Sequence, residues 1–190
     1  MGADQNKRFT YGVDEVYGVV VLCDEQSALL CAEVSKVVGE VGPSDLVINN
    51  DDARPHVTLL HFACNRLQAK QMWSEIEPVN TEMTLATTGL HASGWGTGVV
   101  VHLGITMTSQ LRSLHDRLCA AANELKIPLV SKHGVEYEAH ITLGFWVDGQ
   151  DHSDQLEEII LPDNVSGPLC LVSIGAHGTV ADVLMPISVS

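Results

Sequence analysis

Two short segments of the chain repeat one pattern of histidine and threonine. HVTL begins at His56 and HITL begins at His140. Side chains two apart on an extended strand share a face, so Thr58 points the same way as His56, and Thr142 the same way as His140. Two imidazoles that titrate near neutral pH, together with two hydroxyl donors, could move protons around a phosphate group and bind its oxygens. We expect this chemistry to need no metal and no other cofactor.

Strands and helices alternate around these motifs. Runs of β-branched or alternating apolar residues predict strands, and apolar residues three to four apart predict helices, with Asp24 and Ser109 as caps. The predicted strands cover residues 16–22, 54–62, 81–90, 99–105, 138–147, 168–176 and 179–189. The predicted helices cover residues 25–40, 66–77, 108–125 and 153–160, and a glycine-rich turn is expected over 93–98.

The order of these elements indicates an internal duplication of a strand-helix-strand unit. GVVVL from Gly18 resembles GVVVHL from Gly98, and each is followed by an amphipathic helix, a loop and a His-x-Thr strand. No flexible linker separates the repeats. We therefore expect a single domain over residues 1–190 with two pseudo-symmetric lobes, about 13–92 and 96–190, that could exchange strands. If the lobes pack face to face, the two motifs meet.

The net charge limits the choice of partner. Ten Lys and Arg against 24 Asp and Glu leave a formal charge of −14. This charge disfavours long duplex nucleic acid and leaves open a small anionic substrate that is held by a few local donors in a cleft. The five cysteines show no paired spacing, and the first residues lack the apolar run of a signal peptide or membrane span. We expect a cytoplasmic monomer with no membrane partner.

Paired HVTL and HITL strands in a duplicated chain of this length resemble the 2H phosphoesterase superfamily, which includes the LigT-like 2′-5′ RNA ligases and cyclic nucleotide phosphodiesterases. The resemblance implies an α+β, duplicated two-lobed LigT-like fold, in which two antiparallel sheets form a central cleft and the helices lie on the outside. It also implies that the catalytic residues are His56, Thr58, His140 and Thr142. The second motif differs from the usual pattern at Ala139, where a proline often stands.

Other polar and aromatic residues could contact the substrate. The loop SKHGVEYEA, residues 131–139, gathers a cation, an imidazole and an aromatic ring in an otherwise acidic chain. A lysine there could balance phosphate charge and a tyrosine could stack on a base, although an ordinary solvated loop has the same composition. The candidate substrate-binding residues are Tyr137, Lys132, His133, His102, Tyr17 and Trp95. Packing in the core or at the surface is the alternative for the last three.

Further histidines are predicted to be structural. His61 lies five positions after His56, so strict alternation places it on the opposite face of the strand, and Phe145 is placed opposite His140 in the same way. His115 lies among the leucines of a predicted helix and is expected to be exposed. A zinc site is not favoured, because neither His-Glu-x-x-His nor Cys-x-x-Cys occurs.

The residues and the resemblance together predict a metal-independent phosphodiesterase with two-histidine general acid and base catalysis. The expected substrates are 2′,3′-cyclic phosphates, 2′-5′ oligoadenylates or cyclic oligonucleotide messengers. A non-catalytic nucleotide-binding module, acting as a sensor or sponge, is the alternative of a different class, and 2′-5′ RNA ligase activity is a third. Ligation is less favoured because the chain has no nucleotide-activating motif.

Overall fold

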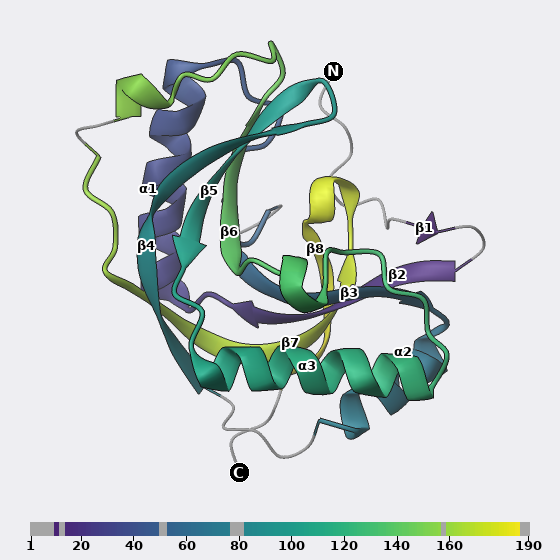
Figure 1. The fold of residues 1–190 in the computed structure, drawn as a ribbon. Helices are drawn as coiled ribbons and strands as arrows, with labels where there is room; N and C mark the ends of the chain where they lie inside the picture. The colour runs from purple at the N-terminus through teal and green to yellow at the C-terminus, as the bar shows by residue number, and fades with distance from the viewer. Residues whose placement is uncertain (1–9, 12–13, 50–52, 77–81, 157–158, 187–190) are drawn as a thin grey trace.

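The structure is a computed structural model and describes residues 10–11, 14–49, 53–76, 82–156 and 159–186. Within these residues, eight strands pair antiparallel and three α-helices pack on the sheets (Figure 1). The strands are β1 (Thr10–Tyr11), β2 (Asp14–Leu22), β3 (His56–Cys64), β4 (Glu82–Trp95), β5 (Gly98–Ile105), β6 (His140–Trp146), β7 (Asn164–Ile174) and β8 (Val180–Pro186). The helices are α1 (Glu25–Val41), α2 (Arg66–Ser74) and α3 (Ser109–Glu124), with short 3-10 segments η1 (Gly134–Glu136), η2 (Ser153–Leu156) and η3 (Ala176–Gly178). No α-helix in this part of the chain is long and apolar enough to cross a membrane.

Strand β7 belongs to two sheets at once. Its first half, residues 164–168, pairs with β4, and its second half, residues 169–173, pairs with β2. One sheet therefore contains β1, β2, β3, β8 and the end of β7, and the other contains β4, β5, β6 and the start of β7. In Figure 1, β4, β5 and β6 run upright, whereas β2, β3 and β7 run across the picture.

Each long helix packs on the sheet of the other repeat. α1 follows β2 in the chain but packs against β6, and α3 follows β5 but packs against β3. The apolar side chains between helices and sheets form one continuous core. Fully buried members of this core from the two motif strands include Leu59, Phe62, Leu143 and Trp146. The core therefore joins the two sheets into one body around the cleft.

The helix starts follow from local sequence. Asp24 caps α1 as predicted, since its Oδ1 accepts a hydrogen bond from the backbone N of Ser27 at 2.8 Å. α3 is capped by Thr108 and not by the predicted Ser109, because the Thr108 hydroxyl accepts from the backbone N of Leu111 at 3.1 Å. The prediction was therefore wrong by one residue.

Several other elements differ from their predicted bounds; β7, for example, begins at Asn164 and not at residue 168. The strand predicted over 81–90 continues to Trp95, because β4 pairs with β5 as far as a tight turn at Gly96, whose φ is 61°. The helix predicted over 153–160 is only the 3-10 segment Ser153–Leu156, and part of the predicted range lies outside the described residues.

Both motif strands contain a β-bulge at the same position. The register of β3 shifts at Leu59 and that of β6 shifts at Leu143, in each case the leucine of the His-x-Thr-Leu motif. A bulge inserts one residue, so the side chains that follow it exchange faces. His61 and Phe145 consequently line the same cleft as the motif histidines. Their predicted placement on the opposite face was wrong, because alternation alone does not reveal an inserted residue.

Gly167 lies near the point where β7 passes from one sheet to the other, and a Cβ there would overlap the carbonyl group of Leu22. We expect Gly167→Ala to lower the free energy of unfolding by about 1–3 kcal/mol, because the extra group must displace packed backbone. Gly39→Ala on α1 is the control. Open space surrounds Gly39, and alanine in a helix should raise stability by roughly 0.5–1 kcal/mol. Equal stability of the two variants in urea unfolding would contradict the close approach at Gly167.

Candidate active site

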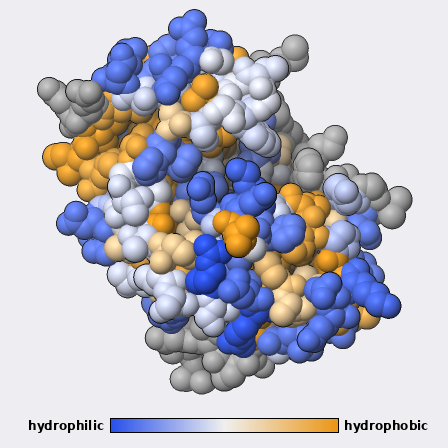
Figure 2. Space-filling view, viewed as in Figure 1, coloured by the Kyte–Doolittle hydropathy of each residue, from blue (hydrophilic) through white to orange (hydrophobic). Residues whose placement is uncertain are grey.

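A cleft of about 440 Å³ opens between the two sheets. Figure 2 shows hydrophilic side chains gathered around the centre of the face that is viewed. The cleft residues come from β3, β5 and β6, from the end of β4, and from the segments before β3, before β6 and between β7 and β8. The four residues of the motifs, His56, Thr58, His140 and Thr142, all line this cleft. The structure therefore brings the two motifs together.

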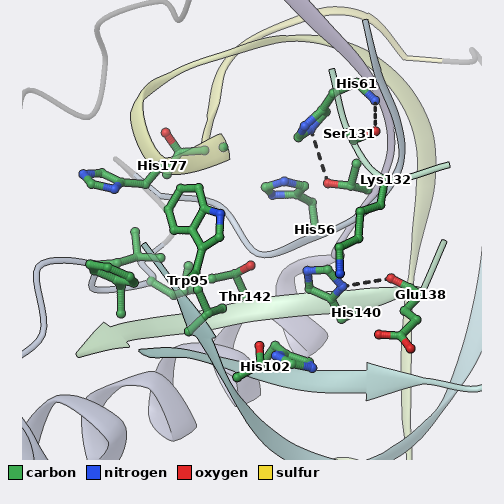
Figure 3. Close-up of a pocket in the computed structure, with 18 of the residues that line it drawn as sticks. His56, His61, Trp95, His102, Ser131, Lys132, Glu138, His140, Thr142 and His177 are labelled. Atoms are coloured by element: carbon green, nitrogen blue, oxygen red, sulfur yellow. Dashed lines mark hydrogen bonds between the residues drawn. The ribbon is translucent and has the colours of Figure 1, made fainter. Parts of the chain in front are cut away.

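The two motif histidines are held in the same way. His56 Nδ1 lies 2.8 Å from the carbonyl oxygen of Arg54. His140 Nδ1 lies 2.9 Å from the carbonyl oxygen of Glu138, a hydrogen bond drawn in Figure 3. A carbonyl oxygen can only accept a hydrogen bond, so each Nδ1 carries a proton and donates it. In the neutral form of each ring, Nε2 is therefore the basic nitrogen that can take a proton from a substrate.

Burial and a second imidazole determine the charge of His56. Desolvation lowers the pKa of His56, and the hydrogen bond to the Arg54 backbone partly opposes this shift. The nearby His140 lowers the pKa of His56 further, and the backbone of Gly178 raises it. A proton on one motif histidine therefore disfavours a proton on the other. A pair with one neutral and one protonated ring is the arrangement that general acid and base catalysis uses.

Two more imidazoles line the cleft beside the motifs. His61 Nε2 lies 3.3 Å from Thr58 Oγ1, and the ring centroid of His102 lies 4.9 Å from that of His140. Burial, with a smaller contribution from neighbouring imidazoles, lowers the pKa of His61 to about 3 and the pKa of His102 to about 4. Both rings are therefore neutral near pH 7.

His102 lines the cleft, and its contact with the substrate stays a prediction. It lies opposite Thr142 in the ladder between β5 and β6, and its ring stacks against His91 with 5.6 Å between centroids. The Nδ1 of His102 is buried and has no hydrogen-bond partner within the described part of the chain. Buried polar atoms without a partner are rare in folded proteins. Among the same described residues, no group of three or more His, Cys, Asp or Glu side chains is arranged to hold a metal ion.

The loop before β6 was predicted to supply Lys132 and His133 to the substrate. Lys132 is exposed and lines the cleft, and its side chain extends toward His140 in Figure 3. His133 is exposed and lies outside the residues that line the cleft, and its Nδ1 lies 3.0 Å from the carbonyl oxygen of Ser131. The prediction of His133 as a substrate contact is therefore corrected.

Tyr137 borders the cleft but its ring is not available to stack on a base, contrary to the prediction. The residue is 6% exposed, and its ring lies parallel to that of His115 with 3.9 Å between centroids. Its hydroxyl donates to the carbonyl oxygen of Thr58 at 2.8 Å. Tyr137 therefore holds the backbone of the first motif.

His115 is fully buried, although it was predicted to be exposed. Its Nδ1 donates to the carbonyl oxygen of Leu59 at 2.8 Å, and its Nε2 accepts from the backbone N of Gly134 at 3.0 Å. The spacing could have revealed this burial, because His115 lies four residues after Leu111 and three before Leu118, on the apolar stripe of α3.

Helix α1 makes the corresponding hydrogen bond to the second motif. Ser35 Oγ donates to the carbonyl oxygen of Leu143 at 2.6 Å and accepts from the backbone N of Ile48 at 3.0 Å. Ser35 and His115 occupy equivalent positions in the two repeats. Each bulged leucine is therefore held by a buried side chain from the helix of the opposite repeat.

Aromatic rings line the end of the cleft beside the second motif. Trp95 is 60% exposed and makes an edge contact with Phe145, with 5.8 Å between ring centroids. The ring of His177 lies 6.3 Å from that of Phe145, and its φ of 55° is in the left-handed region that non-glycine residues rarely adopt. Gly98 leaves room for the Phe145 ring, since a Cβ there would overlap it. Of these rings, the sequence analysis identified only Trp95 as a substrate candidate.

Tyr17 lies on the helix-facing side of β2, contrary to its prediction as a substrate residue. It is 2% exposed, its ring stacks on Phe62 with 6.5 Å between centroids, and its hydroxyl donates to Glu15 Oε2 at 2.6 Å. The neighbouring Gly18 takes the cleft-facing position, where it contacts His61. Tyr17 is therefore a core residue.

The chain belongs to the 2′-5′ RNA ligase superfamily, whose family model matches residues 21–171. The matched range contains both His-x-Thr motifs. This match confirms the resemblance to the LigT-like 2H phosphoesterases that the motifs indicated. No curated protein matches the chain in a sequence comparison.

Three solved structures share the fold of this chain. E. coli LigT complexed with 3′-AMP superposes with a TM-score of 0.54 at 15% identity, covering 90% of this chain and 94% of LigT. LigT complexed with phosphate gives a TM-score of 0.52 at 17% identity, covering 90% and 93%. A structure described as a phosphoesterase gives 0.51 at 14% identity, covering 92% and 96%. These similarities confirm the predicted α+β, LigT-like fold.

Ser35→Ala would remove both hydrogen bonds of the Ser35 hydroxyl and leave the Leu143 carbonyl and the Ile48 N–H buried without this partner. We expect the free energy of unfolding to fall by about 1–3 kcal/mol for each group left unpaired. Ser113→Ala, at an exposed position on α3, is the control and should change stability by less than about 0.5 kcal/mol. If urea unfolding gave the same midpoint for both variants, Ser35 would not be holding the bulge.

Proposed function

We propose that the protein is a metal-independent phosphodiesterase that binds the phosphate of its substrate between the two His-x-Thr motifs. The observation that carries this proposal is that His56 and His140 make the same hydrogen bond. In each ring, Nδ1 bonds to the carbonyl oxygen two residues earlier, which leaves Nε2 as the basic nitrogen. Thr58 and Thr142 add a hydroxyl donor from each sheet. A tetrahedral anion would therefore meet donors from both sides. Membership of the superfamily and the similarity to LigT complexed with phosphate support the same site.

His56 is the general base in this proposal. Burial favours its neutral ring, so Nε2 can accept the proton of a water or ribose hydroxyl that attacks phosphorus. His140 then donates a proton to the departing oxygen, which leaves the pair with the same total number of protons. Lys132 and the two threonine hydroxyls stabilise the negative charge on the non-bridging oxygens.

The proposed substrate is a small nucleotide or a short oligonucleotide. Trp95, Phe145 and His177 offer aromatic surface at one end of the cleft, and stacking of a base on such a surface contributes about 1–3 kcal/mol. The formal charge of −14 opposes a long polyanion. LigT complexed with 3′-AMP supports a nucleotide ligand. Cyclic 2′,3′-phosphates, 2′-5′ oligoadenylates and cyclic oligonucleotides all belong to this class.

A 2′-5′ RNA ligase is the second candidate, because the matching family model carries that description. The same acid and base could pass a phosphate to an RNA hydroxyl in place of water. The two functions differ in product, since hydrolysis releases a phosphomonoester and ligation joins two RNA ends.

Incubation with 2′,3′-cyclic nucleotides, 2′-5′ oligoadenylates and cyclic dinucleotides in excess EDTA tests the proposed function. We expect product from the wild type, and a fall in kcat/KM of roughly 10² to 10⁴ in His56→Ala or His140→Ala, because each loses a proton-transfer group. Thr58→Ala and Thr142→Ala should lose roughly 10- to 100-fold, the effect of one phosphate donor.

His133→Ala is the matched control, since His133 lies outside the cleft, and should retain the wild-type rate. Binding without product would indicate a non-catalytic nucleotide-binding module, and joined RNA ends would indicate a ligase. Wild-type activity in the His56→Ala, His140→Ala double variant would overturn the proposed mechanism.

The pH dependence of kcat/KM tests the choice of His56 as the base. The base must be neutral, and burial lowers the pKa of His56 below its ordinary value near 6.5. The rate should therefore stay high as the pH falls to 6.5 and decline only below it, when His56 takes up a proton. A flat profile between pH 5 and 9, or an acid limb above pH 6.5, would contradict the assignment.

A further inference from the structure

His61 lies within hydrogen-bond distance of a motif threonine. The bulge at Leu59 turns His61 into the cleft, where its Nε2 lies 3.3 Å from Thr58 Oγ1 (Figure 3). Its backbone N donates to Ser131 Oγ at 3.0 Å. Gly18 lies opposite His61 in the ladder, and a Cβ at Gly18 would come within 2.9 Å of His61 Cδ2. The ring is therefore held in a fitted position on the cleft side of the strand.

The second motif has no counterpart to this hydrogen bond. Phe145 occupies the position equivalent to His61, since each lies five residues after its motif histidine and just beyond the bulge. Phe145 has no polar atom to offer Thr142. A phenylalanine ring can therefore fill this position. Compared with such a ring, the imidazole of His61 adds a hydrogen-bonding group next to Thr58.

The tautomer of His61 determines what Thr58 can offer to an anion. Burial lowers the pKa of His61 to about 3, so the ring is neutral near pH 7 and carries one proton. If Nε2 accepts, the single hydroxyl proton of Thr58 points at His61 and only oxygen lone pairs face the cleft. If Nε2–H donates, the Thr58 proton is free. An anion in the cleft stabilises the second arrangement, because lone pairs repel it and a hydroxyl proton attracts it.

We propose that His61 is a positioning residue, which donates Nε2–H to Thr58 Oγ1 and so turns the Thr58 hydroxyl proton toward a phosphate oxygen of the substrate. The inference rests on the proposed function and extends it, because it gives the first motif a hydrogen-bonded chain that the second motif lacks. His61 acts through Thr58 and does not contact the phosphate itself.

A double-mutant cycle on kcat/KM tests this role. His61→Phe, which places the residue of position 145 at position 61, should lower kcat/KM by about tenfold, the effect of weakening one phosphate donor. The His61→Phe, Thr58→Ala double variant should be no slower than Thr58→Ala, because the effects of residues that act through one another are not additive. Independent, multiplicative losses, or a wild-type rate in His61→Phe, would overturn the proposal.

Two polar variants keep the test valid if phenylalanine disturbs the fold. The amide nitrogen of glutamine can replace Nε2, so His61→Gln should recover most of the rate that His61→Phe loses. Asparagine is one bond shorter and cannot reach Thr58, so His61→Asn should remain slow. Equal rates for the two amide variants would overturn the role, and a purely structural residue would show no such difference at equal thermal stability.

The tautomer of His61 can be measured without a substrate that the protein converts to product. ¹⁵N NMR of the imidazole nitrogens of wild-type protein, titrated with inorganic phosphate, should show His61 as the Nε2–H tautomer when phosphate is bound. The Nδ1–H tautomer in the phosphate complex would overturn the inference. If no nucleotide is turned over but the Nε2–H tautomer forms, the proposed phosphodiesterase function fails and the positioning of Thr58 toward an anion stands.

Discussion

The geometry of the cleft depends on two buried hydrogen bonds that cross between the repeats. His115 of α3 donates to the carbonyl of Leu59, and Ser35 of α1 donates to the carbonyl of Leu143. A bulge disrupts the local strand ladder, so its backbone groups need partners from elsewhere. Each of these side chains also accepts from the backbone of the loop that leads into a motif strand. The bonds stabilise the bulges, and the bulges determine which side chains enter the cleft.

The two repeats share the bulged motif strand but differ in the side chains that follow the bulge and line the cleft. After the first bulge the cleft receives His61, and after the second it receives Phe145 beside Trp95 and His177. One end of the cleft is therefore rich in imidazole, and the other end is rich in aromatic surface. A nucleotide has two matching parts, since its charged phosphate suits the imidazole-rich end and its flat base can stack at the aromatic end.

The features that could be predicted from the sequence were those that depend on patterns local in the chain. The strands that carry HVTL and HITL and the helices α1, α2 and α3 follow from short-range periodicity, and the LigT-like fold follows from the resemblance that the repeated motif carries. The errors about His61, Phe145 and Tyr137 have a common physical origin. The faces of His61 and Phe145 depend on an inserted residue, and the burial of Tyr137 against His115 depends on a helix that crosses to the other sheet. Neither event leaves a periodic signal near the residue that it affects.

The position of β7 has a consequence for synthesis of the protein. Its residues hydrogen-bond to β2 and to β4, and it follows both of them, together with β3, β5 and β6, in the chain. On the ribosome, a nascent chain that ends before β7 has two incomplete sheets whose edges are unpaired. The parts of the cleft can therefore assemble only after nearly the whole chain has emerged, and a truncated product would expose open strand edges to aggregation.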